Sequence, residues 1–212
     1  MKRLLLISWI FLLSGILWLS EVKADVRMPL IFGDHMVLQQ DSKIAIWGWA
    51  DAGENIEIVF AGQKVKTTAH TDGTWKANLK PIKMRKEGQT LTIAGKNKLV
   101  YSDVLVGDVW VASGQSNMEF MLRASSTAKE DMAAANNDNI RLFDMKCRWA
   151  TNAVEWDSSV LDSLNHLQYY KDTKWTASTS KTAASFSAVA YAFGKMLQDS
   201  LQVPVGLICN AI

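Results

Sequence analysis

The hydrophobic pattern of this sequence changes near Asp103, and the change predicts two regions of different architecture. Before this point, short alternating stretches recur, and in one of them Ile56, Ile58 and Phe60 share a face at a period of two. No helical period occurs in this region. Short strands at this spacing are typical of a small all-β sandwich or jelly-roll-like domain, which we place at residues 25–103.

After Asp103 the pattern becomes that of strands alternating with helices. Residues 109–112 are continuously apolar, as in a strand covered on both faces, and residues 205–209 repeat this pattern. Between them, one helical face is formed by Phe186, Val189, Ala190, Phe193, Met196 and Leu197. Strand, helix and strand in this order predict a parallel α/β sheet with right-handed crossovers, which we place at residues 104–212.

The segment 114–118, Gly-Gln-Ser-Asn-Met, directly follows the first of these apolar strands. A serine on a sharp turn just past the carboxyl end of a central strand is where an α/β enzyme can expose a nucleophile. Ser116 is therefore the candidate catalytic residue. Gly114 would allow the sharp turn, and the amides of Gln115 and Asn117 are suited to bracing it. These three residues are the candidates for substrate binding and oxyanion support. Met118 replaces the second glycine of a Gly-x-Ser-x-Gly elbow, so this is not the α/β-hydrolase turn.

Several segments carry a family resemblance in their order and spacing. They are residues 31–39, 47–50, 72–75, 103–110, 114–118, 186–191 and 203–208. Together they resemble the SGNH hydrolases, specifically the carbohydrate-esterase branch with a Gly-Gln-Ser-Asn block, and within it the sialate O-acetylesterase family. The resemblance runs from about Arg27 to the last residue. It implies an SGNH-hydrolase (flavodoxin-like) parallel sheet, preceded by the small β-domain.

The resemblance also implies a chemistry. Ser116 would attack the acetyl ester of an O-acetylated sugar, sialic acid in this family, and its backbone N–H would be one oxyanion donor. No cofactor or metal is expected. The family's Gly-Gly pair, oxyanion-hole asparagine and Asp-x-x-His base would all follow Ile212. We therefore expect the N-terminal part of such an esterase, inactive alone, with an unpaired sheet edge at residues 208–209.

Two alternatives stay open. An acetylxylan-type esterase would carry the same serine block. A non-catalytic secreted protein with a carbohydrate-binding β-module would use Trp47, Trp49 and Trp75 as a sugar-stacking face. Tryptophan in a small sandwich is more often core, however, and Trp47 and Trp49 share a strand face, as core packing predicts. Residues 146–174 are polar with four aromatic residues, which is typical either of a binding loop or of disorder.

No histidine of this chain is assigned as the base. His35 and His70 lie in the β-domain and lack the family's Asp-x-x-His context. His166 has Asp162 nearby, but it precedes the main helix, whereas the family's base follows the last strand. The two cysteines make no disulfide framework, and no Cys-x-x-Cys or His-rich spacing predicts a metal site.

Residues 1–24 have the three parts of a secretory signal peptide. Lys2-Arg3 are basic, residues 4–19 are mostly apolar, and Val22-Lys23-Ala24 is a cleavage site; an uncleaved membrane anchor is the alternative. The protein would be exported to the periplasm or beyond.

The full sequence has 23 basic and 21 acidic residues, and residues 1–24 contain three basic residues and one acidic residue. Without them, the chain has 20 of each. This balance gives no electrostatic case for nucleic acid or an anionic membrane, so the expected partner is an acetylated sugar. No oligomeric state is predicted.

Overall fold

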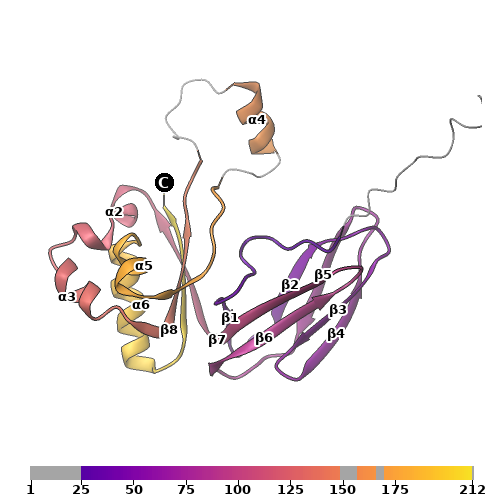
Figure 1. The fold of residues 1–212 in the computed structure, drawn as a ribbon, viewed down its shortest axis with the longest axis horizontal. Helices are drawn as coiled ribbons and strands as arrows, with labels where there is room; N and C mark the ends of the chain where they lie inside the picture. The colour runs from indigo at the N-terminus through magenta and orange to yellow at the C-terminus, as the bar shows by residue number, and fades with distance from the viewer. Residues whose placement is uncertain (1–24, 149–156, 166–169, 212) are drawn as a thin grey trace, which may run out of the picture.

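The computed structural model describes residues 25–148, 157–165 and 170–211, which form a large mixed sheet and a two-stranded sheet (Figure 1). The large sheet has the order β4-β3-β6-β7-β10-β8-β9, with β1 also paired to β7, and the small sheet is β2-β5. The strands are β1 (Val37–Gln39), β2 (Ile44–Trp49), β3 (Asn55–Phe60), β4 (Gln63–Thr68), β5 (Thr74–Leu79), β6 (Arg85–Ala94), β7 (Lys98–Gly114), β8 (Asn137–Met145), β9 (Thr176–Ser178) and β10 (Val205–Ala211). The helices are α2 (Ser116–Glu119), the 3-10 helix η1 (Leu122–Ala124), α3 (Ala128–Ala133), α4 (Ser158–Asn165), α5 (Ser180–Ala184) and α6 (Ala188–Leu201).

The N-terminal strands form because apolar and polar residues alternate along them. In β3, Ile56, Ile58 and Phe60 are at most 1% exposed, while the residues between them are only half-buried. β3 pairs antiparallel with β4 and β6, and β2 pairs antiparallel with β5. The shared face predicted for these three residues is therefore confirmed.

β7 joins the N-terminal strands to the rest of the chain without a loop. Its residues 98–106 pair antiparallel with β6, residues 105–107 pair parallel with β1, and residues 108–114 pair parallel with β10. The strand thus carries the backbone directly from the N-terminal sheet to the serine turn. The domain boundary predicted at 103/104 falls inside β7, and the division of the chain there stays a prediction.

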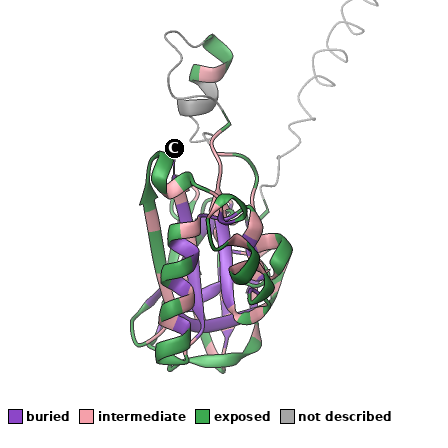
Figure 2. Cartoon of the chain, turned by 90° about the vertical axis from the view of Figure 1, so that its left-hand side faces the viewer, coloured by how far each residue is buried: buried purple, intermediate pink, exposed green. Residues whose placement is uncertain are grey.

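β10 lies between β7 and β8 and is parallel to both. Helix α6 packs on this sheet; its first turn is capped by the Ser187 hydroxyl, which accepts a hydrogen bond from the N–H of Ala190 at 3.2 Å. Gly194 permits close packing, since a Cβ there would overlap the side chain of Leu207. Figure 2 shows the buried strands behind the helices that face the viewer. The predicted α/β pattern, with parallel strands in a mixed sheet, is confirmed to this extent.

The orientation of α6 corrects the helix face that the sequence predicted. Val189, Phe193 and Met196 of that face are 52%, 38% and 64% exposed. Phe186 and Ala190 of the predicted face are buried and Leu197 packs against the core, so the prediction is wrong for three of its six residues; the other buried residues of the helix are Tyr191, Gly194 and Gln198. Ala190 and Gly194 let the helix backbone approach the sheet, and Val189, Phe193 and Met196 lie on the outer side of the helix.

The open edge of the parallel strands also differs from the prediction. Ile208 has a partner on each side, Val111 in β7 and Phe143 in β8, so the expectation of an unpaired edge at residues 208–209 is wrong. Within the described ranges, residues 110–114 of β7 pair only with β10, and Trp110 and Val111 are 44% and 66% exposed. Local sequence pattern identifies strands but not their order in a sheet, which is why the edge was misplaced.

Three other features bear on the predictions. No helix in the described ranges is long and apolar enough to cross a membrane, and these ranges contain no group of three or more possible metal ligands. Cys209 is buried and Cys147 half-buried, and neither forms a disulfide. The predicted signal peptide at residues 1–24 lies outside the described residues.

Candidate active site

Ser116 is exposed at the first position of α2, two residues after β7 ends at Gly114 (Figure 1). Gln115 makes the turn with non-helical backbone angles, φ −118° and ψ −147°. Its carbonyl oxygen accepts hydrogen bonds from the N–H groups of Met118 at 2.7 Å and Glu119 at 3.0 Å. The backbone of the turn is therefore held while the serine side chain stays accessible.

Met118 connects the serine turn to the core. Its side chain packs against the core under α6, and the Ser187 hydroxyl donates a hydrogen bond to its sulfur at 3.4 Å. A Cβ on Gly114 would lie 3.1 Å from the Met118 Cβ, a tight contact, and Gly114 does not have a left-handed φ; glycine thus favours close packing of the turn on Met118. Just beyond, the N–H of Ala188 donates to the carbonyl of Phe120 at 2.8 Å. The serine turn is thus fixed to the start of α6.

The predicted supporting amides lie at the surface. Gln115 and Asn117 are exposed, and their side chains make no hydrogen bond to any residue that the structure describes. The bracing seen here comes from the backbone carbonyl of Gln115 instead. Roles for the two side chains in binding substrate, and for Ser116 in catalysis, stay predictions.

The carboxyl ends of three parallel strands meet beside the turn. Asn210 of β10 lies opposite Ser113 of β7 on one side and Met145 of β8 on the other. The Tyr170 hydroxyl donates a hydrogen bond to Asn210 Oδ1 at 2.9 Å. Ligands of open parallel sheets bind at this edge. Sequence reasoning missed Asn210, although its position directly after a buried strand was a usable signal.

Asp144 lies near the carboxyl end of β8 and is a second residue at this edge of the sheet that the sequence analysis did not identify. Burial raises the pKa of its carboxyl group, Lys146 at 3.3 Å lowers it in part, and the charge of Glu119 raises it further. Its buried Oδ1 has no hydrogen-bond partner among the described residues. Burial, together with this carboxylate, also raises the pKa of the Cys209 thiol. Cys209 is consequently no rival to Ser116 as a nucleophile.

His35 contacts a carboxylate, as a catalytic histidine often does, but it lies far from Ser116. Its Nδ1 lies 2.7 Å from Asp103 Oδ2, and Arg141, which is buried, donates to the same oxygen at 2.5 Å. Gly114 lies ten positions after Val104 on β7, which corresponds to about 33 Å of strand. His35 cannot therefore serve as a base for Ser116.

The other two histidines add no base to the described site. His70 is exposed in the turn that follows β4. His166 lies outside the described residues. Among the residues that the structure describes, the serine turn accordingly has no histidine beside it.

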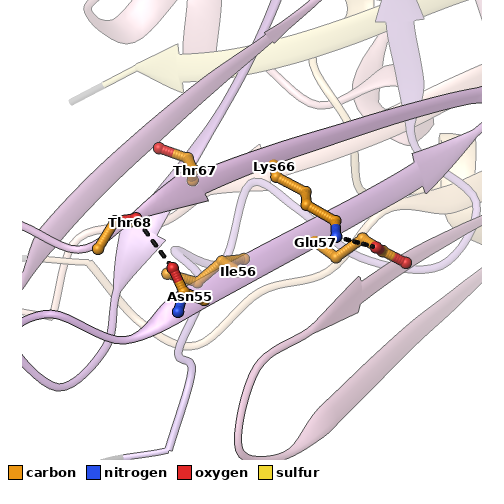
Figure 3. Close-up of a pocket in the computed structure, with 6 residues that line it drawn as sticks. All are labelled: Asn55, Ile56, Glu57, Lys66, Thr67 and Thr68. Carbon is orange, nitrogen blue, oxygen red and sulfur yellow. Dashed lines mark hydrogen bonds and ion pairs between the residues drawn. The ribbon is translucent and has the colours of Figure 1, made fainter.

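A surface hollow over β3 and β4 is no alternative site (Figure 3). Its polar groups satisfy one another: the Thr68 hydroxyl donates to Asn55 Oδ1 at 3.0 Å, and Lys66 Nζ lies 3.6 Å from Glu57 Oε2. Both strands lie at the far end of the sheet from β8 and β10. The hollow is therefore separate from the serine turn.

The fold that carries this serine turn is similar to that of a carbohydrate acetylesterase. The crystal structure of a carbohydrate acetylesterase from Xanthomonas citri superposes with a TM-score of 0.75 and 32% sequence identity, covering 88% of this chain and 40% of that one. No model of a protein family matches the sequence.

The sequence is also similar to those of curated sialate O-acetylesterases. The chain is 31% identical over 203 residues to the sialate O-acetylesterase of Rattus norvegicus, covering 87% of this chain and 35% of that protein. It is 30% identical over 216 residues to that of Homo sapiens, covering 92% and 39%. The chain is thus a homologue of the sialate O-acetylesterases, as the motifs predicted. It spans well under half the length of these relatives, which fits the prediction that it corresponds to their N-terminal part.

Proposed function

We propose that this chain supplies the serine nucleophile of an exported carbohydrate O-acetylesterase that acts on O-acetylated sialic acid. The observation that carries the proposal is the exposed Ser116, on a braced turn at the carboxyl edge of β7, β10 and β8. Homology to sialate O-acetylesterases and to a carbohydrate acetylesterase supports the reaction and the class of substrate.

The reaction would proceed in two steps. Ser116 Oγ attacks the acetyl carbonyl carbon while a base takes the hydroxyl proton, and the sugar oxygen leaves with a proton from that base. Water then attacks the acetyl-serine, releasing acetate and restoring the hydroxyl. In this scheme the N–H of Ser116 donates to the oxyanion that forms in each step.

A serine hydroxyl is a weak nucleophile without a base. His35 lies about 33 Å of strand away and is not this base. In our proposal the base and the remaining oxyanion donors come from residues outside those that the structure describes. Loss of the base alone costs an enzyme of this type several orders of magnitude in rate. We therefore expect the chain by itself to release acetate very slowly.

The sharpest test is a chimera with a relative. Residues 25–212 would replace the matching part of the Xanthomonas citri carbohydrate acetylesterase, whose remaining residues complete the protein. Acetate release would be measured with an aryl acetate and with 9-O-acetylated sialic acid. We expect activity, and a loss of at least 1,000-fold on Ser116→Ala, because the nucleophile is then absent.

Ser113→Ala is the matched control, because Ser113 is also exposed and lies three residues away on the same segment. It should retain most of the activity. A folded chimera that keeps its activity after Ser116→Ala, or that loses it on Ser113→Ala alone, would refute the assignment. Turnover of acetylated xylan in place of acetylated sialic acid would support the acetylxylan-type alternative.

Export is tested separately. If residues 1–24 are a signal peptide, protein collected outside the cytoplasm should begin at Asp25. N-terminal sequencing that finds Met1 on the exported protein would contradict this.

A further inference from the structure

Trp47 and Trp49 are not core residues, contrary to the sequence prediction. They are 40% and 36% exposed, whereas Trp75 is buried at 2% exposure, as expected of core. β2 alternates strictly: Ile44 and Ile46 face the core, so Trp47 and Trp49 share the opposite face. The shared face was predicted correctly, but it is the outer one.

The two indoles form one wall of a hollow of about 580 Å³. Trp47 packs edge to face against Trp49, with ring centroids 5.9 Å apart, and against Phe32 at 6.1 Å. These contacts hold the indole planes at 75° to each other without burying either ring fully. We call this space the tryptophan hollow.

The opposite wall comes from the other end of the chain. Phe143 and Met145 of β8 line it, together with residues 170–173. Two contacts of Trp175 hold the walls together: its ring packs on Phe143 with centroids 5.2 Å apart, and its Nε1–H donates to the carbonyl of Ile31 at 2.7 Å. The hollow is therefore a product of the fold, built between β2 and the carboxyl end of β8.

Polar groups lie on one side of the tryptophan hollow, and hydrogen bonds between them fix their positions. Arg148 Nε donates to the carbonyl of Tyr170 at 2.8 Å, and its guanidinium also donates to Asp172 Oδ1 at 3.2 Å. Asp172 is 86% exposed, so it retains acceptor capacity for a ligand. Arg148 and Asp172 compensate each other's charge, and Lys171, which also lines the hollow, adds a positive charge to this side.

We propose that the tryptophan hollow binds a pyranose unit of a glycan. A pyranose ring has an apolar C–H face, which fits against an indole, and equatorial hydroxyls that need donors and acceptors at the side. An apolar hollow of this volume with a few convergent polar groups has the character of a small-ligand site. Recognition here is through the ring and its hydroxyls, so neither an acetyl ester nor Ser116 is required.

The tryptophan hollow and the serine turn both lie near the carboxyl edge of the parallel strands. Tyr170, which lines the hollow, reaches Asn210 at the carboxyl edge of β10, the same edge at which Ser116 lies. A glycan held here would therefore lie against the same part of the molecule as the proposed esterase site. The two sites nevertheless remain separable, because they share no lining residue.

The test is titration calorimetry of the purified chain with 3′-sialyllactose and xylohexaose. We expect saturable binding of at least one of them. Trp47→Ala and Trp49→Ala should each weaken it at least tenfold, since each removes a stacking surface. Trp110→Ala is the matched control, because Trp110 is equally exposed and packs edge to face on Phe193, outside the hollow. It should bind as the parent does.

Two further variants keep the outcome interpretable. Arg148→Gln should weaken binding without removing an aromatic ring, and it covers the case in which a tryptophan variant unfolds. Ser116→Ala should leave the affinity unchanged, which separates this site from the proposed catalytic one. The inference is overturned if neither sugar binds, if the hollow variants bind normally, or if Trp110→Ala is as damaging as they are.

Discussion

Trp110 and Phe193 pack edge to face, with ring centroids 5.2 Å apart, and both rings remain more than a third exposed. This contact joins the open edge of β7 to the outer surface of α6. The large apolar residues exposed on the carboxyl half of β7 and on α6 are Trp110, Val111, Val189, Phe193, Met196 and Leu201. Exposed apolar surface beside an unpaired strand favours association between chains.

We therefore predict that the purified chain self-associates at micromolar concentration. Val111→Lys should shift it towards the monomer, because a charge on an edge strand opposes pairing. Sedimentation velocity measures the change. Val100→Lys is the control, since Val100 is also exposed on β7 but lies ten positions before Trp110, in the part of the strand that pairs with β6. Equal sedimentation of all three proteins would contradict the prediction.

Gly107 is expected to be intolerant of substitution. It is the last β7 residue to pair with β1, and a Cβ there would overlap the carbonyl oxygen of Pro204. Gly107→Ala should lower the free energy of unfolding by about 2–3 kcal/mol, because backbone rather than a side chain must move. Urea denaturation would measure this. Gly33→Ala, where nothing lies within 4 Å of the added Cβ, should change stability by less than about 0.5 kcal/mol.

Asp103 is predicted to stabilise the fold through Arg141. Burial by itself would raise the pKa of the Asp103 carboxyl, but hydrogen bonds from Arg141 and His35 outweigh it and hold the pKa below its usual value. Asp103→Asn leaves the buried guanidinium without its charged partner and should cost about 1–3 kcal/mol. Because the folded pKa is lowered, the parent should lose this stability as the pH falls below about 4, and the variant should not. Thermal unfolding between pH 3 and pH 7 would distinguish them.

Asp144 should have the opposite pH dependence. Its folded pKa is raised by burial, so its contribution to stability is complete below the unfolded pKa and is lost as the pH rises through the raised value. Asp144→Asn should therefore increase stability at pH 7, by roughly 1 kcal/mol or less, and flatten the decline above pH 4.

The control for Asp144 is Asp72→Asn. The N–H of Thr74 donates to the Asp72 carboxylate at 2.9 Å, and its hydroxyl donates at 2.7 Å, which lowers the pKa. This variant should lose stability at neutral pH and should not gain any. A gain in both variants would mean that the Asp144 effect has another cause.

Local pattern was sufficient for features that depend on neighbouring residues. The alternation in β3, the strand before Ser116 and the helix after Ser187 all follow from spacing along the chain. The position of Ser116 at the end of a parallel strand was predictable for the same reason, once the Gly-Gln-Ser-Asn block had been noticed.

Features that depend on distant residues were not predictable in this way. The open edge of β7 depends on the placement of β10, and the burial of Arg141 beside Asp103 joins residues 38 positions apart. The exposure of Trp47 and Trp49 depends on which face of β2 meets the core. Alternation shows that the two faces of a strand differ in composition, but it does not show which face the core covers. A pair of tryptophans can lie on a core face or on an exposed face.

The pairing of β7 has a consequence for how the chain folds during synthesis. Val111 pairs with Ile208, so the carboxyl half of β7 finds its parallel neighbour only after about 90 further residues have been made, which takes about 5–20 s on the ribosome. Throughout that interval an apolar segment and the serine turn at its end have no strand beside them. Such sequence-distant pairing makes folding slow. We therefore expect the nascent chain to depend on a holding chaperone until β10 emerges.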